Sequence, residues 1–335
     1  AGQGDGALEV DVLNDLGIAQ SAAGDHAAAM VTFERAARKI AKRNGSTLRA
    51  RQNHLVAAFQ SWKELELLLD RVREVGSWTG NLEKQSSDAY AQFESSLNTA
   101  LFELSAYDSK EVLAMHLRLT AAMSAQRAGK VSKASALYGE ALRIARDLES
   151  REFEASALLG LAEQYQDSGR HKDALQLLDA TRLIEDDIGP AQQARLEVLT
   201  AESRFALAPE AAGTGDAIRL AIAAVESIRS DLARSQLVSD LGRGFREFSG
   251  RPYLLLADHL LLKAGSGAAS EQGLQEDLRA ARDAIEGFKT WELNDFYRDD
   301  CVNLALERAR NLDQLGDPSV CLLYTSDAAD DPTLV

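Results

Sequence analysis

The chain has few cysteines, few prolines and fewer basic than acidic residues. Its 335 residues include two cysteines and five prolines, and 37 Lys and Arg are set against 52 Asp and Glu, which gives a formal charge of −15. Two cysteines are too few for a disulfide framework or a four-cysteine zinc site. Binding of a phosphate backbone needs a basic surface, so the acidic balance argues against nucleic acid as a partner.

Long apolar runs and strand patterns are also missing. A membrane span needs about 18 consecutive apolar residues, and the most apolar stretch, 253–262, is shorter and interrupted by Asp258 and His259. Alternation of Val, Ile and Thr is nowhere sustained, whereas Ala and Leu dominate, with Glu, Lys, Arg and Gln between them. The sequence therefore predicts an all-α fold without a membrane segment. The prolines are expected in connections: Pro190, Pro209, Pro252, Pro318 and Pro332.

An internal repeat is present. Near the start, Leu16-Gly17 places a small residue where two helices approach, and Gly24 is expected to form the turn that follows. An apolar stripe spaced i, i+4, i+7 comes next, as on one face of a helix. The stripe occurs four times: Ala29, Phe33, Ala36; Ala134, Tyr138, Ala141 after Gly129; Ala174, Leu178, Thr181 after Gly169; and, with an insertion, Ala217, Ala221, Ala224. The residues expected in the core are Leu16, Ala29, Phe33, Ala134, Tyr138, Leu161 and Ala174.

This pattern resembles the tetratricopeptide repeat (TPR), which has an early Leu-Gly, an Ala on the second helix, a large apolar residue and another Ala. The resemblance covers about 11–234, while 48–75 and 88–107 are expected to be helical without an assigned register. It implies an α-solenoid of helix-turn-helix units, because each pair must bury its apolar face against the next. It also implies a concave groove that binds a protein or a peptide with an apolar anchor. The implied groove residues are Asp11, Asn14, Ile18, Ser21, His116, Leu119, Met123, Gln126, Ser156, Leu159, Glu163 and Gln166.

The pattern changes after Ala224. A helix around Arg251-Pro-Tyr-Leu-Leu-Leu-Ala, a Gly/Ser/Ala-rich turn and a helix with Glu286, Lys289 and Glu292 follow. Together with the stretches 291–301 and 312–318, they resemble the helices that lead into a CHAT domain, a family that couples TPR repeats to a caspase-like cysteine peptidase fold. The resemblance implies that this chain is the sensing or regulatory half of such a protease.

The catalytic segments of that family are not recognised in this sequence. Cys301 lies on a predicted helix with no histidine after it, so it does not match the nucleophile. The five histidines lack the spacing of metal ligands, and no cofactor motif occurs. We therefore expect no enzyme activity, cofactor or metal in this chain. The alternatives are a TPR sensor of another signalling or transcriptional regulator, or a stand-alone adaptor.

Three segments are predicted: a TPR-like solenoid over 1–235, CHAT-like leading helices over 236–320 and a tail over 321–335. The tail resembles the translation of a sequencing adaptor, with a genuine tail as the alternative. Because the chain also starts without Met, a fragment truncated at both ends is expected. The sequence favours a cytoplasmic location only slightly and leaves the compartment open.

Overall fold

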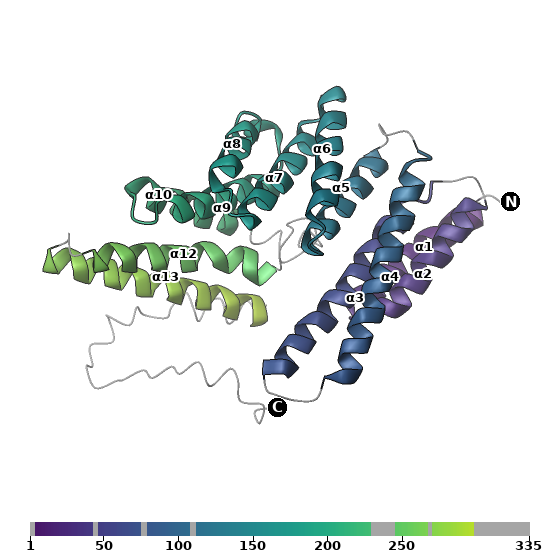
Figure 1. Cartoon of the computed structure of the whole chain (residues 1–335), viewed down its shortest axis with the longest axis horizontal. Coiled ribbons are helices and arrows are strands. Elements are labelled where there is room, and N and C mark those ends of the chain that lie inside the picture. Colours follow the sequence, from purple (N-terminus) through teal and green to yellow (C-terminus); the bar gives the residue numbers. More distant parts are fainter. Residues whose placement is uncertain are drawn as a thin grey trace. The chain divides into compact units, whose positions relative to one another are not determined.

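The computed structural model describes residues 4–42, 46–74, 79–107, 112–228, 245–266 and 270–297, and all regular structure within them is helical, which confirms the all-α class (Figure 1). A short 3₁₀ helix covers Glu185–Asp187. The α-helices are α1 (Gly4–Ala22), α2 (His26–Ala41), α3 (Leu48–Glu74), α4 (Gly80–Leu104), α5 (Val112–Arg127), α6 (Val131–Asp147), α7 (Arg151–Asp167), α8 (His171–Arg182), α9 (Pro190–Leu207), α10 (Ala212–Ser227), α12 (Phe245–Gly265) and α13 (Glu271–Tyr297).

The chain divides into two compact units, 1–284 and 285–335. Of the second unit the structure describes 285–297, the last part of α13. The predicted boundary between 235 and 236 lies outside the described residues, as do Cys301, the stretch 312–318 and the predicted tail over 321–335.

The first unit is built from stacked helical hairpins. We call α1, α3, α5, α7, α9 and α12 the first helices, and α2, α4, α6, α8 and α10 the second helices. Each second helix packs against its own first helix and against the next first helix along the chain. Each first helix also contacts the next first helix, up to the contact of α12 with α9. This repeated set of contacts is that of a helical-repeat solenoid, in which each hairpin buries its apolar face against the next.

The predicted stripes form the core of the second helices. The members of the first three stripes expose 2% or less, and in the fourth Ala217 and Ala221 are buried while Ala224 is half-buried. Two of the predicted core positions differ. Leu161 is half-buried, and the prediction for Leu16 is wrong because its side chain, on the outer face of α1, is 48% exposed.

The predicted turn glycines end three first helices. Gly24, Gly129 and Gly169 have φ values of 80°, 70° and 71°, in the left-handed region that glycine enters without steric cost. After each of them a backbone N–H bonds back to a carbonyl five residues earlier, as from Lys130 to Ala125 at 2.8 Å. Such bonds satisfy carbonyls that the helix end leaves open and start the return to the second helix.

Gly17 permits the close approach that the Leu-Gly pair predicts. A Cβ atom built on Gly17 would lie 2.5 Å from Cε1 of Phe33 on the opposite helix of the hairpin. Phe33 is 2% exposed and therefore fixed by its surroundings. Any larger residue at position 17 would push α1 and α2 apart.

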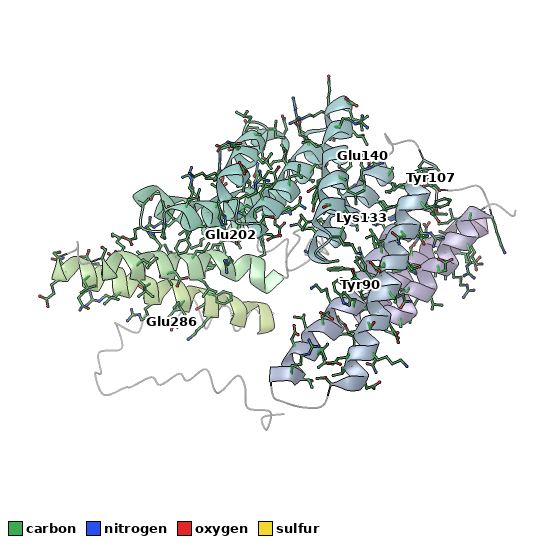
Figure 2. The ribbon with its side chains drawn as sticks, viewed as in Figure 1. Tyr90, Tyr107, Lys133, Glu140, Glu202 and Glu286 are labelled. Atoms are coloured by element: carbon green, nitrogen blue, oxygen red, sulfur yellow. The ribbon has the colours of Figure 1, made fainter. Side chains whose placement is uncertain are left out.

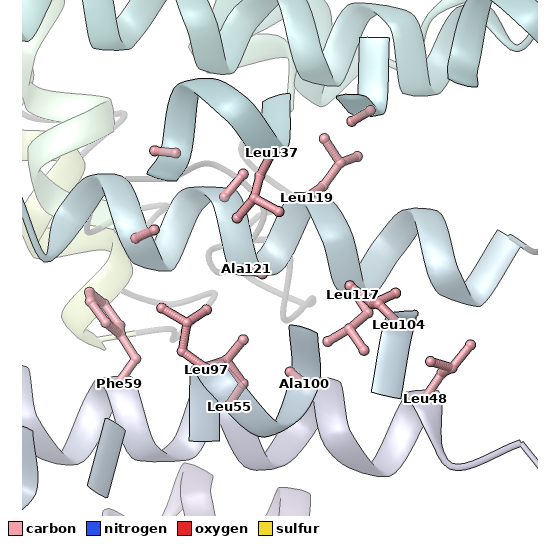
Figure 3. Close-up of a cluster of buried hydrophobic side chains, with 14 of the residues drawn as sticks. Leu48, Leu55, Phe59, Leu97, Ala100, Leu104, Leu117, Leu119, Ala121 and Leu137 are labelled. Carbon is pink, nitrogen blue, oxygen red and sulfur yellow. The ribbon is translucent and has the colours of Figure 1, made fainter. Parts of the chain in front are cut away.

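The hairpin of α3 and α4 is longer than the others, which explains why no TPR register fits it. The two helices have 27 and 25 residues, and α4 begins at Gly80 instead of near Asp88. Trp62 stacks on Phe93 between them, with ring centroids 5.6 Å apart. Farther along, Leu55, Leu97 and Ala121 meet where α3, α4 and α5 converge (Figure 3).

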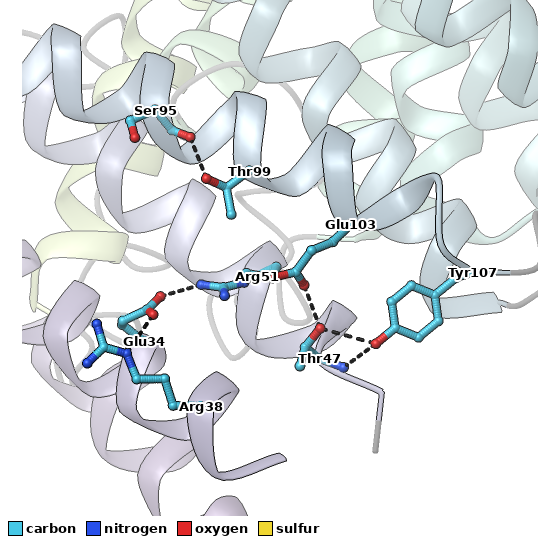
Figure 4. Close-up of polar contacts among 8 residues, drawn as sticks. All are labelled: Glu34, Arg38, Thr47, Arg51, Ser95, Thr99, Glu103 and Tyr107. Carbon is cyan, nitrogen blue, oxygen red and sulfur yellow. Dashed lines mark hydrogen bonds and ion pairs between the residues drawn. The ribbon is translucent and has the colours of Figure 1, made fainter. Parts of the chain in front are cut away.

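A half-buried arginine ties three helices together. Arg51 on α3 bonds Glu34 on α2 and, at 2.7 Å, Glu103 on α4 (Figure 4). Burial raises the pKa of Glu34, but the hydrogen bonds from Arg38 and Arg51 outweigh it and hold that pKa below its ordinary value. The carboxylate therefore stays charged where it joins the first two hairpins.

Pro252 is an exception among the described prolines. Pro190 begins α9 and Pro209 lies between α9 and α10, as predicted, but Pro252 is inside α12. A proline there removes one backbone hydrogen bond. The flanking residues Phe248 and Leu255 are buried in a cluster with α9 and α10, so packing holds the helix together across the proline.

Candidate binding face

The twelve predicted groove residues all lie on first helices, four each on α1, α5 and α7. We call this set the first-helix face. Seven of its members keep at least part of their surface exposed and could touch a ligand: Asp11, Ile18, Ser21, His116, Met123, Gln126 and Ser156.

The other five are buried between helices. Leu159 is completely buried, and the rest expose 8% or less. The prediction that Leu159 points into an open groove is wrong, because α7 is covered by α6, α8 and its first-helix neighbours α5 and α9. The buried members are Asn14, Leu119, Leu159, Glu163 and Gln166.

The last face residue of each helix bridges to the next first helix. Ser21 donates to Gln60 on α3 at 3.0 Å, and Gln126 donates to Asp167 on α7 at 3.0 Å. Gln166 donates to the Ser203 hydroxyl on α9 at 2.7 Å. One repeat position therefore forms a polar clamp between consecutive first helices, 39, 41 and 37 residues apart in sequence.

Charged pairs reinforce these junctions. Glu163 on α7 and Arg195 on α9 form an ion pair in which the side chains are 9% and 7% exposed. Glu202 on α9, labelled in Figure 2, forms a further ion pair with Arg251 on α12 at 3.4 Å. In the buried Glu163–Arg195 pair each charge compensates the other, so loss of either side chain would leave an uncompensated buried charge.

Tyr138 lies close to this charged row. Burial raises the pKa of its phenol well above the ordinary value of 10, against the opposing field of Arg195. The hydroxyl is buried without a hydrogen-bond partner among the described residues. The side chain is therefore neutral and acts by packing.

Two residues that the sequence pattern did not predict extend the first-helix face. Gln60 on α3 accepts from Ser21, and Gln192 on α9 donates to Ser156 at 2.6 Å. His116 adds an edge-to-face contact with Phe153 on α7, with ring centroids 5.0 Å apart. Neither α3 nor α9 had an assigned face register. Both glutamines lie 36 to 39 residues after Ser156 and Ser21, close to the repeat length, but Gln193 falls in the same window, so spacing alone would not have separated Gln192 from it.

Other kinds of site have little support within the described ranges. No group of three or more His, Cys, Asp or Glu side chains there could hold a metal ion. In the same ranges, no helix combines the length and apolar character that crossing a bilayer requires. A shallow pocket of about 550 Å³ lies between α9 and α12, lined by Phe205, Asp258 and Leu261 among others. Its lining also includes Glu210 and Ser266, but none of the residues predicted to bind a ligand lies there, so the first-helix face is the better candidate.

No protein-family model matches the chain, and no curated protein matches it. The resemblance to TPR and CHAT proteins therefore stays a prediction from the sequence.

Proposed function

We propose that this chain is a protein-binding scaffold that holds a peptide with an apolar anchor against its first-helix face. Ile18 and Met123 offer partly exposed apolar side chains for the anchor. Ser21, Gln126 and Ser156 supply hydrogen-bonding groups on the same helices or on the next first helix. A mixed surface of this kind suits a peptide whose apolar residue is buried while its backbone stays hydrogen-bonded.

The clamps between first helices are the observation that carries the proposal. They fix the polar members of the face before any ligand arrives, so binding orders fewer side chains. Among the exposed members Asp11 is the only carboxylate, and the set contains no Lys or Arg. A strongly charged peptide would find little complementary charge among them.

We further propose, from the resemblance of α12, α13 and the stretches 291–301 and 312–318 to CHAT proteins, that the scaffold is the sensing half of a caspase-like protease. This chain would then bind the signal and carry no catalytic step. A stand-alone adaptor or a sensor for another regulator would use the same face without a peptidase.

Selection from a random 12-residue peptide library, followed by affinity measurement, tests the binding role. Met123→Glu places a charge in the anchor site, and we expect at least a tenfold weaker affinity for the selected peptides. Leu220→Glu is the matched control, since Leu220 is 58% exposed on α10, away from the face. Selection of no peptide, or equal affinity for both variants, would contradict the role.

The protease role has a separate test. The coding sequence beyond residue 320 is expected to encode a strand-rich region with one His-bearing and one Cys-bearing segment. If roughly the next two hundred codons lack them, the CHAT assignment is wrong while the binding role stands.

A further inference from the structure

Four polar side chains meet where the first two hairpins join. His26, the first residue of α2, places its Nδ1 atom 3.0 Å from the Ser21 hydroxyl on α1. Its Nε2 atom lies 2.9 Å from a carboxylate oxygen of Glu64 on α3. Ser21 in turn lies 3.0 Å from the side-chain carbonyl of Gln60 on α3. The imidazole is buried while the Glu64 side chain is 61% exposed, so one chain of hydrogen bonds runs from the surface through the buried ring to Gln60.

The positions of the hydrogen atoms in this chain depend on the charge of His26. An ionised carboxylate can only accept, so His26 donates to Glu64 from Nε2 in either state. When Ser21 donates to the Gln60 carbonyl, its single hydroxyl hydrogen is used. The contact between Ser21 and Nδ1 then needs a second hydrogen on the ring. This arrangement therefore belongs to the charged imidazolium.

A neutral His26 reverses two of these bonds. Its Nδ1 atom accepts from the Ser21 hydroxyl, whose oxygen then needs a donor from Gln60, so the amide turns its NH2 group toward Ser21. The Gln60 Nε2 atom forms no hydrogen bond with the described residues and is not closed off from water, so the amide has room to turn over. Protonation of His26 therefore changes the outward group of Gln60 from a carbonyl to an NH2 group.

In the neutral state two acceptors lie next to each other. Gln60 and Glu64 are one helical turn apart on the same side of α3, which brings the outward carbonyl near the exposed carboxylate. Such a pair of acceptors suits an ammonium or a guanidinium group. Ile18, one of the two anchor positions, lies one turn before Ser21 on α1. A peptide anchored on Ile18 would bring a neighbouring basic residue to Gln60 and Glu64.

Glu64 is the charged side chain that contacts the His26 ring. The two helices that pack on α2 are α1 and α3, and the last turn of α1 is uncharged. Next to Glu64 on α3, the Lys63 ammonium lies 4.8 Å from the centre of the Trp62 ring. Asp25, just before α2, accepts from the backbone at the positive end of that helix. A proton on His26 therefore acts first on the charge of Glu64.

We propose that the peptide ligand carries a Lys or Arg beside its apolar anchor, that Gln60 and Glu64 hold this residue, and that protonation of His26 releases it. The proton offsets the charge of Glu64 and turns the NH2 group of Gln60 toward the ligand cation. Histidine side chains change charge between about pH 5 and 8, so acidification over this range should weaken binding. This inference rests on the proposed function, because it specifies the ligand and the regulation of the same face.

Peptides selected from the random library at pH 8 test the basic residue. They are blocked at both ends and contain no His, Asp or Glu, so their own charge stays constant between pH 8 and 5.5. Replacing their Lys or Arg by norleucine should weaken binding at least fivefold at pH 8 and less than twofold at pH 5.5. Glu64→Gln should cause a similar loss at pH 8. Asp88→Asn, which removes an exposed carboxylate on α4, is the matched control and should not.

The pH dependence of the affinity tests the release. Between pH 8 and 5.5 the natural chain should lose at least fivefold in affinity, and His26→Gln less than twofold. His116→Gln is the control, because His116 is exposed on the same face but outside the chain of hydrogen bonds, and it should keep the loss. If His26→Gln does not fold, Glu64→Gln at its exposed position should also remove the loss. An unchanged loss in the folded variant, or binding that needs no basic residue, overturns the proposal while the binding role stands.

A measurement without ligand separates this inference from the proposed function. The nuclear Overhauser effect between the Gln60 NH2 hydrogens and Ser21 should be stronger at pH 8 than at pH 5.5, because the amide turns over. Equal intensity at both values overturns the inference. Selection of no peptide contradicts the proposed function, and the Overhauser measurement then decides whether the hydrogen bonds reverse.

Discussion

The ring of Tyr138 on α6 lies against the backbone of Gly160 on α7. Tyr138 is 1% exposed, so surrounding side chains prevent the ring from turning away. A Cβ atom at position 160 would lie 2.3 Å from Cε1 of the ring. The two repeats can approach as closely as they do only because residue 160 is a glycine.

Gly160→Ala should therefore lower the free energy of unfolding by about 1–3 kcal/mol, the usual cost of overpacking a core. Gly139→Ala is the matched control, because Gly139 is exposed on α6 with nothing near its added methyl group. That change should raise stability by about 0.5–1 kcal/mol, since alanine favours helix. Urea denaturation measures both. Equal effects of the two substitutions would mean that the Tyr138 contact is looser than described.

Glu149 adopts a backbone conformation that, among the other residues the structure describes, only glycines adopt. Its φ of 53° puts it in the left-handed region, just after α6. Glu149→Gly should raise the free energy of unfolding by about 0.5–1 kcal/mol. The substitution removes the strain of a left-handed φ from the folded state, and that strain is larger than the extra conformational entropy that glycine gives the unfolded chain. Gly129→Ala, with open space around it, should lower stability by about 1 kcal/mol. Thermal or urea unfolding gives the comparison, and a less stable Glu149→Gly variant would contradict the strain.

The turns and second-helix stripes could be predicted because their causes are local. A glycine such as Gly129 permits a left-handed φ, and the spacing of Ala134, Tyr138 and Ala141 puts one apolar face on a helix. The packing of α12 across Pro252 could not be predicted in this way. It depends on contacts of Phe248 and Leu255 with α9 and α10, which are far away in sequence.

The sequence predicted less well which residues of the first-helix face are exposed, and the reason is physical. A first helix inside the solenoid, such as α7, is covered by its own partner, by the preceding second helix and by two first helices. Most of its surface is therefore buried, and its sequence shows no regular polar stripe that would mark a groove. Leu159 and Glu163 sit at positions that the repeat pattern assigns to a groove, yet one is fully buried and the other pairs with Arg195. The opposite holds for Leu16, whose position has the pattern of a core residue although its side chain is 48% exposed.

The clamp at Gln166 should contribute more to stability than the one at Gln126. Gln166 is buried and donates to the Leu199 carbonyl at 2.6 Å and to Ser203, whose side chain is fully buried. Gln166→Leu should cost about 1–3 kcal/mol, because it leaves a buried hydroxyl without that bond. Gln126→Leu removes an exposed bond to Asp167 and should cost less than about 0.5 kcal/mol. Urea unfolding measures both, and a loss of similar size in the two variants would show that burial does not decide the strength of the clamp.

The protonation of His54 should make the fold less stable as the pH falls below neutrality. Burial lowers the pKa of His54 below its ordinary value of 6.5, and Arg51 adds to this while Glu34 opposes it. Below about pH 6.5 the unfolded chain therefore binds a proton that the folded chain binds only at lower pH, so stability falls with pH over that range. His54→Gln cannot take up the proton and should lose less stability than the natural chain between pH 7.5 and 5.5. Urea unfolding at both values measures the loss, and pH 8 serves as the control because there any difference comes from packing alone. Parallel losses in the two proteins would show that His54 does not set this dependence.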